Sequence, residues 1–182
     1  MEIRKLERIT VCDIDKFGLN GFRTRRVLQV ERNENDIYFD CSISEVELEK
    51  EYIKVWPLDN SILNYYNEII SKGMSFGAYD SDKLVGYILL SEMSWNKSLW
   101  IDYIMVADTY KGTGVGSKLI NKALEIGQTN YRVLVLEVQN ENYGAIKFYQ
   151  KLGFNIDGVE FSRYSEKENE KDIAFIMKYK FE

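Results

Sequence analysis

The sequence contains no histidine among its 182 residues. This absence excludes Ser-His-Asp and Cys-His catalysis, histidine-ligated zinc and a histidine general base. Any acid–base chemistry must therefore come from Asp, Glu, Tyr, Lys, Cys or water.

Cysteines and long apolar runs are also scarce. Cys12 and Cys41 are isolated and lack metal-ligand spacing, so we expect free thiols in a reducing cytoplasm and no metal site. No run of about 18 apolar residues could span a membrane, and the first residues after Met1 do not resemble a signal peptide. The net charge of −5, without a basic run, makes nucleic acid an unexpected partner.

What remains is a globular composition, with 45% hydrophobic and 29% charged residues. Its length predicts a single domain over residues 1–182. Apolar periodicity predicts a helix that follows Pro57 and is capped by Asp59, Asn60 or Ser61, a second helix after residue 116, and a third over residues 142–152. The buried stripe of the first helix is predicted to be Ile62, Tyr65, Tyr66, Ile69 and Ile70. The predicted strands cover residues 3–6, 26–31, 37–43, 74–79, 84–91, 99–106, 133–138, 154–163 and 173–180, and a polar connection over residues 165–171 joins the last two.

The most informative stretch is Ile101–Lys118, which predicts a strand, a glycine-rich turn and a helix. Gly112, Gly114 and Gly116 allow left-handed backbone angles and close approach to a ligand. Free N–H groups at the start of the helix can bind an anion. The spacing fits neither a dinucleotide fingerprint nor a P-loop, and an ordinary strand-to-helix turn is the structural alternative.

The pattern Lys111-x-x-Gly114-x-Gly116 resembles the pyrophosphate loop of the GNAT N-acetyltransferases, Gln/Arg-x-x-Gly-x-Gly/Ala. Lys111 departs from it by keeping the charge without the planar guanidinium. The resemblance implies an α/β fold of the α+β type, with a mixed, mostly antiparallel central sheet flanked by helices. It also implies acetyl-coenzyme A as co-substrate, without a metal. The residues it implies for binding this co-substrate are Ile104, Met105, Val106, Lys111, Gly112, Thr113, Gly114, Val115, Gly116, Ser117, Asn142 and Tyr149.

A second motif, Asn142-x-x-Ala145-x-x-Phe148-Tyr149-x-x-x-Gly153-Phe154, resembles the second GNAT signature. In that family a tyrosine on this helix faces the acetyl thioester, which makes Tyr149 the candidate acid for the departing thiolate. The structural alternative is that Tyr149 and Phe148 are core aromatics, with Asn142 and Gly153 as helix caps.

Acyl transfer to a protonated amine needs a proton acceptor, a polarised carbonyl and a proton donor. Without histidine, the candidate acceptors are Asp102 and Glu137, on the two strands that precede the motifs. Either carboxylate could act as base or bind the amine. Glu137 matches a catalytic glutamate of GNATs that acetylate ribosomal-protein N-termini, and Asp102 an acidic position in antibiotic-modifying relatives. We favour Glu137 as base and Asp102 as amine binder.

Nearly the whole chain looks like the streptothricin acetyltransferases, which implies a small cationic amine as acceptor. The stretches that carry this likeness include Asp13–Lys16, Glu31–Asn35, Trp95-Asn96 and Glu137–Asn140. Those relatives carry an acidic pair where this chain has Asp102-Tyr103. Four glutamates in Glu45–Glu51 predict a solvated face or an acidic wall near a cation. The alternatives are a protein N-terminal or lysine acetyltransferase and a non-catalytic coenzyme A-binding domain. For any of these functions we expect a monomer or a homodimer.

Overall fold

The computed structural model describes residues 1–35, 37–164 and 172–181, which divide into two compact units. The first unit contains Met1–Asn20, Val55–Leu136 and the chain from Tyr179 onward. The second contains Gly21–Lys54 and Glu137–Lys178. Strand β7 (Val133–Gln139) begins in the first unit and ends in the second.

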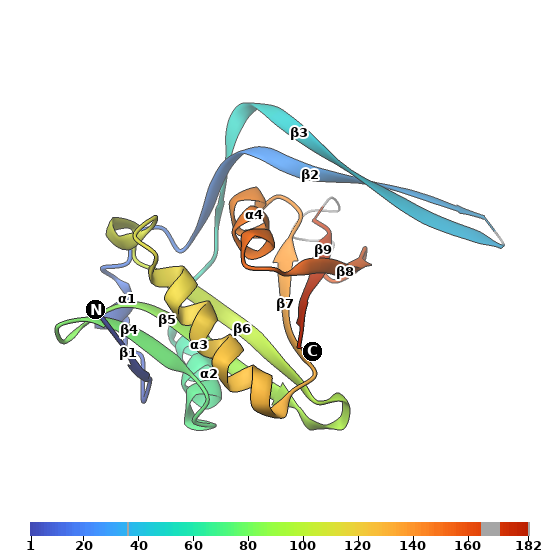
Figure 1. Ribbon diagram of the computed structural model, residues 1–182. Coiled ribbons are helices and arrows are strands. Elements are labelled where there is room, and N and C mark those ends of the chain that lie inside the picture. The colour runs from blue at the N-terminus through green and yellow to red at the C-terminus, as the bar shows by residue number, and fades with distance from the viewer. Residues whose placement is uncertain (36, 165–171, 182) are drawn as a thin grey trace. The chain divides into compact units, whose positions relative to one another are not determined.

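The first unit is built on antiparallel strands in the order β1-β4-β5-β6, and β7 joins β6 in parallel (Figure 1). A parallel pair needs a crossover connection, and helix α3 supplies it. The elements are β1 Glu2–Lys5, α1 Val11–Ile14, α2 Asn60–Ser71, β4 Phe76–Asp80, β5 Lys83–Met93, β6 Ser98–Val106, α3 Val115–Asn130 and β7 Val133–Gln139.

Strand β5 is buried on both faces because a helix covers each of them. Tyr87 and Leu89 belong to the apolar cluster formed with α2. Gly86, whose side alternates with theirs, lies against α3: a Cβ added there would meet Val115 Cγ1 at 3.1 Å. Figure 1 shows α3 running along the front of these strands with α2 behind them. The sheet therefore holds the start of α3 on a rigid support.

The second unit contains a separate two-stranded sheet, β2 Gly21–Asn35 and β3 Tyr38–Val55. Its other elements are the end of β7, α4 Tyr143–Lys151, β8 Asn155–Glu160 and β9 Ala174–Lys180, with strand order β7-β9-β8. Figure 1 shows β2 and β3 as two long strands that twist about each other.

Asn140 ties three of these strands together. Its amide Nδ2 donates to the Leu28 carbonyl on β2 at 3.0 Å, and its Oδ1 accepts from the N–H of Ile173, beside β9, at 2.9 Å. Its backbone N–H and carbonyl bond the same two residues. All the polar groups of a buried side chain are thus used, as burial requires.

These observations confirm the predicted fold class and most elements, with four differences. The three strands predicted before α2 are present, but only β1 joins the large sheet, while β2 and β3 pair separately. The strands predicted at 26–31 and 37–43 are parts of much longer ones. The strand predicted at 154–163 ends at Glu160, and Tyr65 of the predicted buried stripe is 55% exposed. The predicted polar connection 165–171 lies outside the described residues.

A buried polar cluster joins β3 to the chain around α4 and β9. Lys54 Nζ contacts Asp172 Oδ2 at 2.6 Å, and Glu141 interacts electrostatically with Asp172. Within the described ranges, Glu141 Oε2 and Asp172 Oδ1 are buried without a hydrogen-bond partner. Burial first, and then the contact with Asp172, raise the pKa of Glu141 to about 7.

Glu141 should make the chain less stable as pH rises through neutrality. Between the ordinary pKa of 4.5 and about 7, the folded chain binds more protons than the unfolded chain, so the unfolding free energy falls with increasing pH. Glu141→Gln removes this cost, so its gain in Tm over wild type should be larger at about pH 8 than at about pH 5. Differential scanning calorimetry would measure both, with Glu125→Gln on the exposed face of α3 as control. An equal difference at the two pH values would contradict this.

Candidate active site

The glycine-rich turn lies between β6 and α3 and leaves the start of the helix uncapped. Gly112 and Gly114 have φ angles of +78° and +89°, in the left-handed region that favours glycine. Gly114 is the N-cap residue, and among described side chains none bonds there. The first intrahelical bond runs from Lys118 N to Gly114 O at 3.0 Å. The N–H groups of Val115, Gly116 and Ser117 therefore have no intrahelical acceptor.

The space beside the two left-handed glycines of this turn is open. A Cβ added at Gly112 or Gly114 would meet no heavy atom of the described chain within 4 Å. Free N–H groups, glycine angles and open space next to them are what close approach of a pyrophosphate to the backbone requires. The arrangement favours anion binding over a closely packed strand-to-helix turn.

Lys111 contributes charge near the turn but is already paired. Its Nζ contacts Asp108 Oδ1 at 2.5 Å, and Asp108 Oδ2 accepts the Leu19 N–H at 2.9 Å. Gly18 makes room for this carboxylate, since a Cβ there would lie 2.1 Å from Oδ2. The backbone of the turn is thus the main candidate for holding phosphate.

Asp102 is the extra residue of a β-bulge. Leu89 pairs with Tyr103 and Leu90 with Ile101, which leaves Asp102 without a partner on β5. Bulges often redirect a side chain near an active site. Asp102 Oδ2 is buried and, as far as the described chain shows, lacks a hydrogen-bond partner. Burial raises the pKa of Asp102, against a smaller opposing effect of a hydrogen bond from Ser91.

The rest of β6 continues past this bulge. Ile104, Met105 and Val106 pair with Ile88, Tyr87 and Gly86 of β5. The described ladder between β6 and β7 covers Ser98–Ile101 only. Beyond Ile101, the edge of β6 that faces β7 therefore has no strand partner among the described pairings. Its backbone groups there could bind a ligand in an extended conformation.

In the second unit, the second motif forms α4 as predicted. Asn142 is the N-cap and its side chain accepts from Ala145 N at 3.4 Å. Gly153, with φ of +91°, follows the helix. Tyr149 is 7% exposed and packs against the rings of Phe148 and Phe154. Burial, and then the negative charge of Glu137, raise the pKa of Tyr149. Its hydroxyl therefore stays protonated at neutral pH.

Both carboxylate oxygens of Glu137 meet donors from the segment after β8. Tyr164 Oη donates to Oε1, and Arg163 Nε lies 3.7 Å from Oε2. The Glu137 side chain is 27% exposed. Burial and the bond to Glu137 raise the pKa of Tyr164. Neither Arg163 nor Tyr164 was identified from the sequence, since no periodicity or motif connects them to a residue so far away in the chain.

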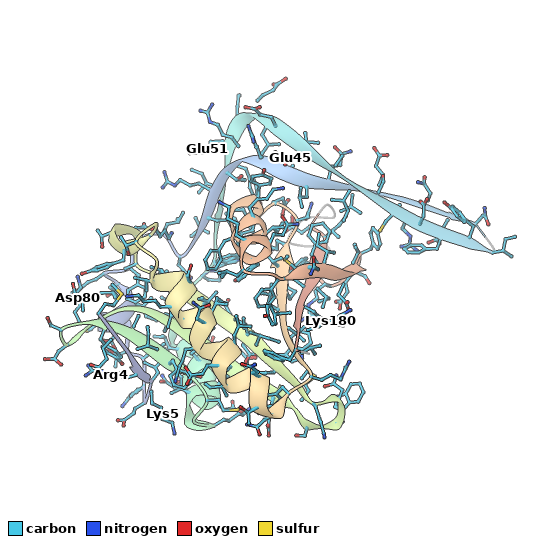
Figure 2. The ribbon with its side chains drawn as sticks, viewed as in Figure 1. Arg4, Lys5, Glu45, Glu51, Asp80 and Lys180 are labelled. Atoms are coloured by element: carbon cyan, nitrogen blue, oxygen red, sulfur yellow. The ribbon has the colours of Figure 1, made fainter. Side chains whose placement is uncertain are left out.

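The acidic stretch Glu45–Glu51 lies within β3, and Figure 2 shows Glu45 and Glu51 at its two ends. Val46 and Leu48 are half-buried between exposed glutamates, which is ordinary strand alternation. Glu45 contacts Arg26 at 3.2 Å and Lys147 at 3.5 Å. The stretch is therefore at least partly a solvated strand face with its own counter-ions.

The predicted site residues thus fall into two groups. The glycine turn, Asp102 and the end of β6 belong to the first unit, whereas Glu137, Asn142 and Tyr149 belong to the second. In the first unit, an open glycine turn and a carboxylate with one buried oxygen lie on one strand–turn–helix segment. In the second, a carboxylate influences a buried phenol. Such groups can bind an anion, accept a proton and donate one.

Comparison with known proteins identifies the family of the chain. The model of the Acetyltransferase (GNAT) family matches residues 43–154. The chain therefore belongs to the GNAT family of acetyltransferases. The predictions of fold class, of an N-acetyltransferase and of acetyl-coenzyme A as donor are confirmed at the level of this family.

Within the family, streptothricin acetyltransferases are among the similar proteins. Streptothricin acetyltransferase A of Bacillus subtilis (strain 168) is 32% identical over 76% of this chain and 79% of its own length. The enzyme of Streptomyces lavendulae is 30% identical over 88% of this chain and 85% of its own.

Two solved structures cover the whole chain. Nourseothricin acetyltransferase aligns over 100% of this chain and 98% of its own, with a TM-score of 0.78 and 26% identity. A protein of Bacillus anthracis str. Ames, assigned to the streptothricin acetyltransferases and solved with acetyl coenzyme A, aligns over 100% of this chain and 97% of its own. Its TM-score is 0.73 and its identity 27%.

No helix in the described parts of the chain is long and apolar enough to cross a membrane.

Replacing Gly114 should weaken cofactor binding. Gly114→Val puts a branched side chain into the open space beside the turn and disfavours a φ of +89°. We expect at least a tenfold loss in affinity for acetyl-coenzyme A, about 1.4 kcal/mol or more, by calorimetry. Gly158→Ala is the control, because its Cβ would make only ordinary contacts with Ile176 on β9. Unchanged affinity in a folded Gly114→Val variant would contradict the role of the turn.

Proposed function

We propose that this chain transfers the acetyl group of acetyl-coenzyme A to a primary amine of a small cationic acceptor, with a streptothricin-type β-lysyl group as first choice. The observation that carries the proposal is the similarity to streptothricin acetyltransferases over three quarters or more of the chain. The buried and half-buried carboxylates support it, because negative potential attracts an ammonium group.

Binding of the donor is proposed to involve mainly residues of the first unit. The N–H groups of Val115, Gly116 and Ser117, with Gly112, Thr113 and Gly114, would hold the pyrophosphate. Backbone groups of Ile104, Met105 and Val106 would hold the pantetheine arm and polarise the thioester carbonyl. The donor supplies an activated acetyl group, so no covalent enzyme intermediate is needed. Asn142 would contribute from the cap of α4, and Lys111 through charge alone.

The proton steps are assigned to carboxylates and a phenol. A primary amine has a pKa of about 10.4, so it arrives protonated and must lose a proton before attack. Glu137 would accept it, directly or through water, and Asp102 would bind the cation. Asp102 suits binding because burial leaves its ionised form poorly solvated until a cation arrives.

Tyr149 is the proposed donor to the departing thiolate. Burial and Glu137 keep its hydroxyl protonated, which an acid requires. The same raised pKa makes complete proton transfer less favourable. Tyr149 would therefore act largely by a hydrogen bond that stabilises negative charge on sulfur in the transition state.

We also propose that residues 1–182 act as one acetyltransferase domain. The family match spans parts of both compact units, and both solved relatives align with the entire chain.

Tyr149→Phe should keep the ring and remove the proton donor. We expect kcat to fall by about 10²-fold or more, with little change in affinity for acetyl-coenzyme A. Steady-state kinetics and calorimetry would measure the two, and Tyr38→Phe, on the exposed part of β3, is a matched control. If the Tyr149 variant keeps wild-type turnover across the pH range, the residue has only a packing role.

Mass spectrometry tests the acceptor directly. Incubation of the protein with acetyl-coenzyme A and streptothricin should add one acetyl group to the antibiotic. Spermidine and a peptide with a free N-terminus serve as competing acceptors. If streptothricin stays unmodified while the peptide is acetylated, the proposal is wrong and a protein acetyltransferase takes its place.

A further inference from the structure

Arg163 is the cation that Glu137 meets in the free protein. Its Nε lies 3.7 Å from Glu137 Oε2, while Tyr164 Oη donates to the other oxygen. Glu137, the carboxylate that the proposed function makes the acceptor of the amine's proton, thus already faces a positive charge. An incoming ammonium group must displace this guanidinium or share Oε2 with it.

The ion pair between Arg163 and Glu137 is weak enough to break. The Arg163 side chain is 41% exposed, and a half-exposed ion pair contributes at most about 1 kcal/mol. Arg163 also has a second carboxylate, because its Nη1 lies 3.2 Å from Glu160 Oε2 at the end of β8. The shorter of the two distances is the one to Glu160. Arg163 can therefore leave Glu137 and still keep a charge partner.

Tyr164 differs from Arg163 in this respect. Its hydrogen bond fixes Oε1, and burial is the main cause of its raised pKa. A protonated phenol brings no net charge, so it orients the carboxylate without competing with a cation. Oε2 is consequently the oxygen that exchanges partners.

We propose that Arg163 occupies the place on Glu137 that the acceptor's ammonium group takes on binding, and that it thereby selects for cationic acceptors. The inference rests on the proposed function, since it takes Glu137 as the carboxylate that meets the amine. A neutral group cannot replace a guanidinium on a carboxylate, whereas an ammonium group can.

This exchange explains how Glu137 can serve catalysis more than affinity. The attraction between the ammonium group and Glu137 is offset by the breaking of the ion pair between Glu137 and Arg163, so little net binding energy results. Once the ammonium lies on Oε2, its proton can pass to that carboxylate, directly or through a bridging water, and the neutral amine can attack.

The test is calorimetric binding of streptothricin to the protein saturated with coenzyme A, which cannot donate an acetyl group. Arg163→Gln removes the competing cation, so streptothricin should bind about three- to fivefold more tightly, the fold-change equivalent to a half-exposed ion pair. Arg163→Lys keeps the charge and should bind like wild type. Lys178→Gln is the control for a general loss of positive charge, because Lys178 on β9 pairs with Asp157 on β8 and not with Glu137 in the described contacts.

The decisive comparison is a double-mutant cycle with Glu137→Gln. The gain from Arg163→Gln should vanish in the Glu137→Gln background. A gain that persists there, or weaker binding by Arg163→Gln, overturns the inference, as does failure of streptothricin to bind wild type. Acetylation of streptothricin without this gain refutes the inference alone. The gain without acetylation refutes the proposed function alone.

Discussion

The parallel pairing of β6 with β7 is the constraint on which the arrangement of the chain depends. Val133–Leu136 are buried and pair in register with Ser98–Ile101. Two parallel neighbours cannot be joined by a short hairpin, so the chain must cross over through α3. The glycine turn is the first part of that crossover, and α4 follows the end of β7. Both sequence motifs thus come directly after the carboxyl ends of parallel strands, the usual location of ligand sites in sheets of this kind.

The segments predicted well are those where the local pattern and the tertiary structure agree. The start of α3 follows from its glycines, and α4 from its capping asparagine and terminal glycine, because these residues act within one helical turn. The lengths of strands β2 and β3 are harder to predict. Their buried positions are few, and a run such as Glu45–Glu51 suggests a charged surface although Val46 and Leu48 alternate within it.

The site was harder to predict where contacts are distant in sequence. The bulge at Asp102 depends on the register of β5, which one strand's pattern does not contain. Arg163 and Tyr164 contact Glu137 although they lie 26 and 27 residues after it in the chain, and no repeat or motif connects them. The partner of Lys111 was equally hidden, since Asp108 is positioned by the amide of Leu19 from the beginning of the chain.

Because the chain has no histidine, differences among its acidic side chains must come from their surroundings. Asp102 is buried at a bulge, Glu141 lies in a cluster with Asp172 and Lys54, and Glu137 is held by a phenol and a guanidinium. Burial opposes ionisation in the first two, which makes each of them sensitive to the arrival of a cation or a proton. Glu137 instead keeps a cation nearby and remains half-exposed. A carboxylate that can exchange one cation for another is suited to receive an ammonium group and then its proton, which is the step that a histidine performs in many other enzymes.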